Sequence, residues 1–215
     1  MSEYHKIQTV YKRDPDNKFK TLLEGDYSLP EFEYLANNEW VFTEKVDGTN
    51  IRVYIQCAGG VVNMDIRGRT DKAEIPNPLN YKLRSMFNKR WDKLFMAFAR
   101  KGPLCLYGEG YGPKIQKGGG NYREDPGFVL FDVEIGGLFL ERTNVISIAQ
   151  SIGVDVVPII GSGTLHDMVA MAKEGIISTW GNFQAEGIVA RPSVEMRTRH
   201  GERIITKIKC KDFNR

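Results

Sequence analysis

The sequence contains few cysteines and no long apolar run. Its three cysteines, Cys57, Cys105 and Cys210, lie far apart and form no C-x-x-C pair, which argues against a structural zinc site and a disulfide framework. No stretch approaches the ~18–20 apolar residues that a membrane span needs. The N-terminus lacks the apolar core of a signal peptide. We therefore expect a cytoplasmic protein with no membrane partner.

Several catalytic signatures are also missing. The sequence has no G-x-x-x-x-G-K-[ST] phosphate loop, no H-E-x-x-H, no G-x-S-x-G and no G-x-G-x-x-G after a strand. Its three histidines, His5, His166 and His200, are scattered along the chain. A histidine-based mechanism and a histidine metal site are therefore not expected.

Positive charge is concentrated near the C-terminus. Residues 191–215 contain eight Lys/Arg and three Asp/Glu, a balance of +5, and because the whole chain carries +3, the remainder carries −2. Such a basic end can be a solvated face or a surface that contacts phosphates. Composition alone does not separate the two.

The apolar pattern predicts an α+β protein with antiparallel sheets rather than a wound parallel sheet. We expect a hairpin over 40–56 with its turn at Asp47-Gly48, and a surface helix over 80–101 whose aromatic stripe faces the core. The other predicted strands are 104–107, 128–135, 187–190 and 203–208, and further helices are predicted near 143–152 and 165–174. With 41% hydrophobic residues, we expect a single domain, 1–215.

Lys45 lies two residues before the Asp-Gly turn. By itself this pattern also fits a solvent-facing lysine beside a turn. A free lysine, with a pKa near ~10.4, is a poor nucleophile unless burial or nearby cations lower that pKa, so a catalytic Lys45 needs cationic neighbours. Lys207, Lys209 and Lys211 alternate along a predicted strand, which would place all three on one face. An exposed edge strand protected by lysines explains that pattern equally well.

Three acids interrupt or flank apolar strands: Glu109, Asp132 and Glu186. A carboxylate is costly to bury unpaired, so each should meet a cation, a hydroxyl or a metal. One such acid would be an ordinary salt bridge. Three of them, together with the lysines, predict a site for a sugar, a phosphate and Mg²⁺.

At these positions the sequence resembles the covalent nucleotidyltransferase superfamily of ligases and mRNA capping enzymes. Each motif is short, but all occur in the superfamily's order, which makes the signal specific. The matches are Lys45-Val46-Asp47-Gly48 (motif I), Arg69-Thr70 (Ia), Tyr107-Gly108-Glu109 (III), Phe131-Asp132 (IIIa), Glu186-Gly187-Ile188-Val189 (IV) and Ile208-Lys209-Cys210-Lys211 (V). Arg67 lies two residues before Arg69 of motif Ia, and Lys207 lies two residues before Lys209 of motif V. The sequence therefore leaves open which residues of each cluster are the functional ones.

The resemblance implies a nucleotidyltransferase (ATP-grasp-like) fold of antiparallel sheets flanked by helices, with the nucleotide pocket between them. It implies that ATP donates AMP to Lys45, with Mg²⁺ or Mn²⁺ as the metal, and that the AMP passes to a nucleic-acid 5′-phosphate that is joined to a 3′-hydroxyl. Under this resemblance Lys209 and Lys211 hold the α-phosphate and keep Lys45 unprotonated. Glu186 and Asp132 serve the metal, and the remaining nucleotide contacts are Glu44, Asp47, Gly48, Asn50, Arg69, Glu109 and Phe131.

Within the superfamily the sequence is most similar to RNA ligases of the RNA ligase 2 type, because of Gly48-Thr49-Asn50 and Ile-Lys-Cys-Lys. That type often has histidine where this chain has Asp47, and aspartate there is usual in DNA ligases and capping enzymes. RNA is therefore the expected partner, with a DNA ligase-type or capping-type enzyme as one alternative and a non-catalytic nucleic-acid-binding module as another. The resemblance covers an adenylyltransferase domain only, without an oligonucleotide-binding barrel or a helical domain after Lys211, and we expect a monomer.

Overall fold

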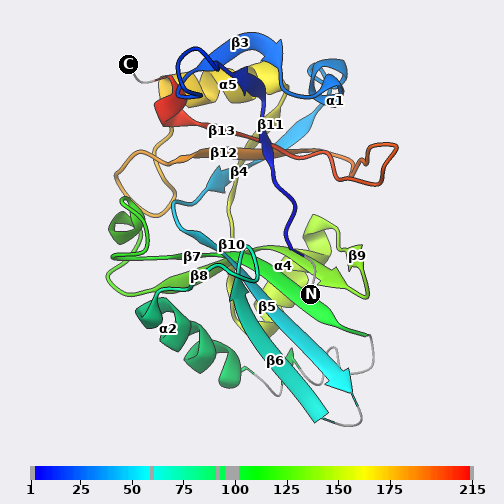
Figure 1. The fold of residues 1–215 in the computed structure, drawn as a ribbon, viewed down its shortest axis with the longest axis vertical. Helices are drawn as coiled ribbons and strands as arrows, with labels where there is room; N and C mark the ends of the chain where they lie inside the picture. Colours follow the sequence, from blue (N-terminus) through cyan, green and yellow to red (C-terminus); the bar gives the residue numbers. More distant parts are fainter. Residues whose placement is uncertain (1–2, 59–60, 91–92, 95–101, 214–215) are drawn as a thin grey trace. The chain divides into compact units, whose positions relative to one another are not determined.

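The chain forms two compact units in the computed structural model, which describes residues 3–58, 61–90, 93–94 and 102–213. Unit 1 comprises Met1–His5 and Asp47–Val157, and unit 2 comprises Lys6–Val46 and Pro158–Arg215. Each unit has its own sheet (Figure 1) and its own hydrophobic core. That the two units act as a single domain stays a prediction.

Unit 1 is built on a sheet with the strand order β10-β8-β7-β5-β6, and β9 pairs with β8. All of its pairs are antiparallel except β10 with β8. Helices α2 (Asn77–Asn88) and α4 (Arg142–Ile152) contribute Leu83, Phe87 and Val145 to the core beside the sheet. The strands are β5 (Thr49–Ala58), β6 (Val61–Gly68), β7 (Leu104–Tyr111), β8 (Gly127–Ile135), β9 (Leu138–Phe139) and β10 (Asp155–Val156).

Unit 2 has a second sheet, with the order β1-β13-β12-β4-β11, and a separate hairpin of β2 and β3. Helix α5 (Leu165–Glu174) packs Met168 and Ala172 into the core with Phe42 and Ile188 of the sheet. The remaining elements are β1 (Gln8–Thr9), β2 (Tyr11–Arg13), β3 (Leu22–Tyr27), α1 (Pro30–Tyr34), β4 (Trp40–Lys45), β11 (Ile159–Gly163), β12 (Gly187–Pro192) and β13 (Thr206–Lys209), with short 3-10 turns η1 (Gly119–Asn121) in unit 1 and η2 (Cys210–Asp212) in unit 2.

The α+β class with mainly antiparallel sheets is confirmed, but the hairpin predicted over 40–56 is wrong. Strand β4 pairs with β11 and β12 in unit 2, whereas β5 pairs with β6 and β7 in unit 1. The turn at Asp47-Gly48 therefore connects two sheets. The local pattern misled because an Asp-Gly turn between apolar strands looks the same whether or not the strands pair with each other.

The predicted helices over 143–152 and 165–174 are confirmed as α4 and α5. Thr164 and Asp167 form the capping box at the start of α5, and Gly175 ends the helix with φ 85°. The helix predicted over 80–101 is found as α2 up to Asn88, with its apolar side in the core. Residues 91–92 and 95–101 of that prediction lie outside the described residues.

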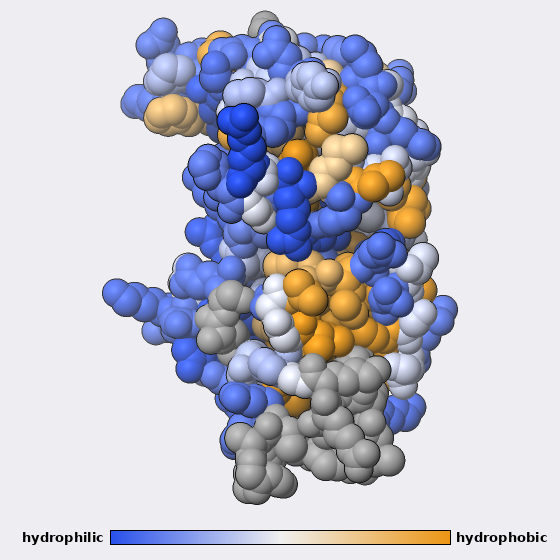
Figure 2. Space-filling view, turned by 90° about the vertical axis from the view of Figure 1, so that its right-hand side faces the viewer, coloured by the Kyte–Doolittle hydropathy of each residue, from blue (hydrophilic) through white to orange (hydrophobic). Residues whose placement is uncertain are grey.

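The surface carries few large apolar side chains. Among the most exposed are Tyr34 in unit 2 and Leu138 in unit 1, and Figure 2 shows one face on which hydrophobic residues gather in one area of a mostly hydrophilic surface. In the part of the chain that the structure describes, no helix combines the length and the apolar character needed to cross a membrane.

Candidate active site

Lys45 is the last residue of β4, and its amine lies against the carboxylate of Glu186. In the sheet, Lys45 is in register with Gly187, the first residue of β12, so Glu186 lies beside the end of β4. The Lys45 Nζ to Glu186 Oε2 distance is 2.5 Å, and the two side chains are 20% and 11% exposed. The lysine that the sequence singled out is therefore ion-paired and largely shielded from water.

The same carboxylate also binds Lys209. Strand β13 places Lys209 opposite Gly187, and Lys209 Nζ lies 2.5 Å from Glu186 Oε1. Burial would raise the pKa of Glu186, but the Lys45 and Lys209 ammonium groups outweigh it and hold that pKa below its ordinary value. One carboxylate thus holds two ammonium groups from neighbouring strands.

Lys207 adds a third cation to this cluster. It precedes Lys209 by two residues on β13, so the two side chains share one face of the strand. Burial, joined by repulsion from the Lys45 and Lys209 ammonium groups, lowers the pKa of Lys207 to about 8. We call Lys45, Glu186, Lys207 and Lys209 the lysine cluster.

The prediction that Lys211 shares this face is wrong, because β13 ends at Lys209 and the chain turns into η2. Asp212 accepts a hydrogen bond from the Lys209 backbone N–H and pairs with Arg13 at 2.9 Å, which fixes the turn. Lys211 is exposed on that turn. Its predicted role in holding the α-phosphate stays a prediction.

Gly187 allows the strands beside Lys45 to approach closely. A Cβ atom at this position would lie 2.1 Å from the Ile208 carbonyl oxygen and 2.7 Å from the Lys209 Cα. Any larger residue would force β12 and β13 apart, and with them Glu186 and Lys209. The glycine of the Glu-Gly pair is therefore required by packing.

Glu44 lies on the opposite face of β4, inside unit 2. It is 1% exposed, and its carboxylate accepts hydrogen bonds from Ser178 Oγ at 2.6 Å and from Thr179 N and Oγ1 at 2.9 Å. These bonds tie the loop before β12 to β4. The predicted nucleotide contact of Glu44 stays a prediction, and the structure adds that its carboxylate anchors this loop.

In unit 1, Asp47 fastens the glycine-rich loop that follows β7, residues 112–121. Its Oδ2 accepts a hydrogen bond from Gly118 N at 3.0 Å, and its backbone N–H donates to Tyr122 Oη at 3.1 Å. Gly48 packs so tightly that a Cβ there would lie 2.3 Å from the Gly110 carbonyl oxygen. The RNA ligase 2 type often has histidine at the position of Asp47. In this chain the aspartate has a local structural role, because it holds the loop.

Asn50 and Glu109 are cross-strand neighbours on β5 and β7. The Oδ1 atom of Asn50 is buried and has no hydrogen-bond partner within the described part of the chain. A buried polar atom without a partner is costly, so this amide fits a site that is completed by a bound polar group. The pairing brings together two residues that the sequence assigned to nucleotide binding.

Phe131 and Asp132 lie on β8, next to the N-terminal segment. Asp132 is fully buried and accepts a hydrogen bond from Tyr4 Oη at 2.5 Å, while Phe131 meets the Tyr4 ring edge-on with centroids 5.1 Å apart. The predicted metal role of Asp132 and the predicted nucleotide contact of Phe131 stay predictions. Arg69 is exposed, one residue after β6.

A family model described as RNA ligase matches residues 38–209. This match covers most of the chain and runs from before Lys45 to Lys209. The chain belongs to the RNA ligase family. No curated protein matches it.

Solved structures of RNA ligase mutants from Naegleria gruberi resemble this RNA ligase family member. An apo mutant superposes with a TM-score of 0.65 at 19% identity, covering 99% of this chain and 58% of the other. A mutant with ATP and Mn gives 0.65 at 20% identity, covering 97% and 56%, and one with AMP and Mn gives 0.63 at 19%, covering 97% and 58%. The likeness supports the nucleotidyltransferase fold, and the chain spans somewhat more than half the length of these relatives.

Two polar contacts of buried side chains near the predicted site residues were missed from the sequence. Arg52 is fully buried on β5 and pairs with Asp71 at 2.8 Å, and Ser178 binds Glu44 from a loop with no motif. An arginine that alternates with apolar residues on a strand was a usable signal for the first. The Ser178 contact depends on two segments that meet only in the fold.

Proposed function

We propose that this RNA ligase family member transfers AMP from ATP to its own Lys45, passes it to the 5′-phosphate of RNA, and joins that end to a 3′-hydroxyl. The lysine cluster carries the proposal. It combines a shielded amine, a carboxylate 2.5 Å away and two further ammonium groups. Cations packed this closely are stabilised when an anion binds among them, and a nucleotide phosphate supplies that charge.

In the first step, Lys45 Nζ attacks the α-phosphorus of ATP. The nitrogen–phosphorus bond forms, the bond from the α-phosphorus to the bridging oxygen breaks, and pyrophosphate leaves with the electron pair. The amine must give up a proton, and Glu186 Oε2 is its hydrogen-bonded acceptor. Lys209 and Lys207 neutralise charge on the phosphate oxygens.

In the second step, an oxygen of the RNA 5′-phosphate attacks the AMP phosphorus, the phosphorus–nitrogen bond breaks, and the Lys45 nitrogen takes up a proton and leaves as the free amine. In the third, a 3′-hydroxyl gives its proton to solvent and its oxygen attacks the phosphorus of the 5′-phosphate. The new phosphodiester forms, the bond to the AMP phosphate oxygen breaks, and AMP leaves with the electron pair. Both steps need positioning and charge neutralisation rather than a further nucleophile. Lys45 is thereby regenerated.

Residues of unit 1 supply the contacts that we assign to the nucleoside. Asn50 with its unpartnered Oδ1, and Glu109 beside it on β7, fit the hydroxyl and polar groups of a ribose. Phe131 is assigned to the adenine ring. Arg69 remains assigned to phosphate or sugar.

The carboxylates assigned to the metal fit a divalent cation only when the nucleotide supplies further oxygen ligands. The described residues hold no group of three or more His, Cys, Asp or Glu side chains that could bind a metal on their own. Mg²⁺ typically takes one or two carboxylates and completes its shell with phosphate oxygens and water, and Glu186 and Asp132 are the carboxylates assigned to it. Bound there, the cation would withdraw charge from the phosphates. The ATP, AMP and Mn in the solved relatives support this choice.

The decisive experiment is an intact-mass measurement after incubation with ATP and Mg²⁺ or Mn²⁺. We expect a gain of one AMP, absent in Lys45→Ala and absent with GTP. Sealing is then tested with nicked RNA and nicked DNA of one sequence, where RNA should be joined faster. An unmodified wild-type mass under all of these conditions would overturn the proposal.

The two alternatives give different results in the same assays. A capping-type enzyme would gain GMP from GTP, and a DNA ligase-type enzyme would seal the DNA nick faster. A binding-only module would form no adduct, and Lys45→Ala would bind RNA as tightly as the wild type. The expected monomeric state and cytoplasmic location stay predictions.

A further inference from the structure

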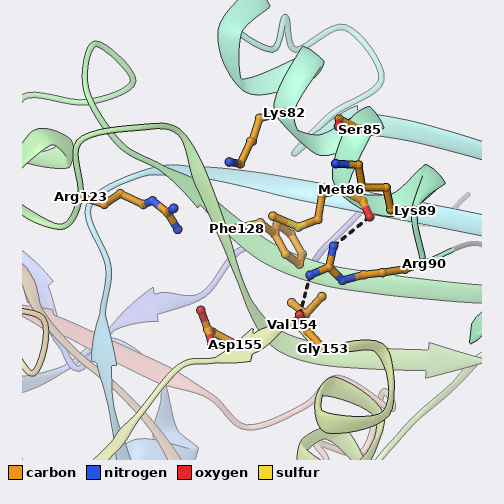
Figure 3. Close-up of a pocket in the computed structure, with 10 residues that line it drawn as sticks. All are labelled: Lys82, Ser85, Met86, Lys89, Arg90, Arg123, Phe128, Gly153, Val154 and Asp155. Carbon is orange, nitrogen blue, oxygen red and sulfur yellow. Dashed lines mark hydrogen bonds between the residues drawn. The ribbon is translucent and has the colours of Figure 1, made fainter.

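A polar pocket lies in unit 1, between α2, the loop around Arg123 and β10. Its volume is about 310 Å³. Lys82 and Ser85 of α2, and Lys89 directly after it, line one side, while Asp155 lies on the other (Figure 3). At positions i and i+3, Lys82 and Ser85 share one face of the helix, and Lys89 caps its end. None of the pocket's residues belongs to the lysine cluster.

The pocket has a surplus of positive charge. Lys82 and Arg123 share the single carboxylate of Asp125, at 2.6 Å each, so this group of three carries one net positive charge. Lys89 is exposed and adds a second one. Asp155, also exposed, is the one acid that lines the pocket itself.

Arg90 builds the wall rather than offering its charge. Its Nε donates to the Ile152 carbonyl at 2.6 Å, and its two terminal nitrogens donate to Met86 at 2.9 Å and to Gly153 at 2.7 Å. These bonds tie the end of α2 to the end of α4. Lys82, Lys89 and Asp155 therefore line a pocket whose frame is fixed.

We propose that this pocket binds one ribonucleotide unit of the RNA substrate, with Lys89 and Lys82 on a backbone phosphate and Asp155 accepting a hydrogen bond from the ribose 2′-hydroxyl. The inference rests on the proposed function, since it names a contact of the same RNA. Lysines bind phosphate as point charges, and the 2′-hydroxyl is a donor that DNA lacks. A carboxylate at the edge of a phosphate site would otherwise only repel the ligand.

The test measures binding of a labelled single-stranded RNA and of DNA of the same sequence by fluorescence anisotropy over a range of salt concentrations. Each phosphate contact with a single strand contributes about 0.7 to the slope of log K against log salt. Lys89→Ala should lower that slope by about 0.7 for RNA and DNA alike, and weaken binding about fivefold at 0.1 M salt. Lys20→Ala, which removes an exposed lysine of unit 2, is the matched charge control and should change binding less.

Asp155→Ala should lower the ratio of RNA affinity to DNA affinity by about fivefold, the value of one hydrogen bond. If Asp155→Ala strengthens RNA and DNA binding equally, Asp155 only repels phosphate and the ribose contact is wrong. If Lys89→Ala behaves like Lys20→Ala, the pocket is not a phosphate site. AMP transfer to Lys45 needs no RNA, so it should be unchanged in all three variants. Loss of that adduct in the wild type would instead refute the proposed function.

Discussion

Lys207 is an ammonium group held where a positive charge is costly. Burial and the neighbouring Lys45 and Lys209 lower its pKa to about 8, from 10.5. A lysine with a lowered folded-state pKa destabilises the protein fully below that pKa, and the cost fades as pH rises toward the unfolded value. The cost in stability is explained if the Lys207 ammonium group binds an anionic ligand.

Replacing Lys207 with an apolar residue should therefore raise the stability of the fold and lower the activity. We expect Lys207→Met to raise Tm at pH 7 by about 2–4 °C, as about 1 kcal/mol does for a chain of this size, and to slow AMP transfer to Lys45. The gain in Tm should shrink above about pH 8 and vanish near 10.5. Thermal melts at several pH values, together with intact-mass time courses, measure both effects. A lower Tm at pH 7 would contradict the argument.

Glu186 is the other residue whose charge matters for the site, because its carboxylate pairs with Lys45 and Lys209. Glu186→Gln keeps the size of the side chain but removes the charge that pairs Lys45 and Lys209, so AMP transfer should slow at least about tenfold. Because its folded-state pKa is lowered, the stability that Glu186 contributes is present above about 4.5 and is lost as pH falls. Urea unfolding at pH 7 and in acid should show the wild type's advantage only at the higher pH.

At the scale of elements, Glu44 connects β4 to the loop before β12. If this anchoring is the main effect of Glu44 on the site, Ser178→Ala should reproduce much of the loss of AMP transfer expected for Glu44→Ala, because either change removes the 2.6 Å bond. We expect each to cost about 1–3 kcal/mol of stability. Unfolding curves and adduct rates test this. A Ser178→Ala variant with normal AMP transfer, beside an inactive Glu44→Ala, would favour a direct nucleotide contact by Glu44.

The glycine-rich loop depends on Asp47 in the same way. Asp47→Ala removes the acceptor for Gly118 N, so limited proteolysis should cut between Gly112 and Asn121 faster than in the wild type. Asp47→Asn retains a carbonyl acceptor and serves as the control. Equal cutting rates in the wild type and Asp47→Ala would show that the Asp47 bond does not order the loop.

At the scale of the whole molecule, the two units keep separate cores. Leu83 belongs to a cluster of unit 1 residues, and Phe42 to one of unit 2 residues. Leu83→Ala should cost about 2–5 kcal/mol. Hydrogen exchange should show lost protection mainly in β5, β7 and β8, with β12 and β13 changed less. Equal loss in both units would mean that they unfold as one.

The sequence alone determined the class of fold and the strands that carry the acids, and it singled out the lysine that we propose as the nucleophile. These features depend on periodicity and on short motifs, which are local properties of the chain. Lys45, Glu186 and Lys209 were all named from the sequence, as were α4 and α5.

Only the tertiary structure decided which strands pair and which charges meet. Strands β4 and β5 adjoin in sequence yet join different sheets, while Lys45 meets Glu186 across 141 residues. Of the three lysines that the sequence placed on one face, Lys211 lies outside the cluster because β13 ends at Lys209, where Asp212 fixes the turn through its bonds to Lys209 and Arg13. Such pairings depend on contacts between distant segments, and no local pattern encodes them.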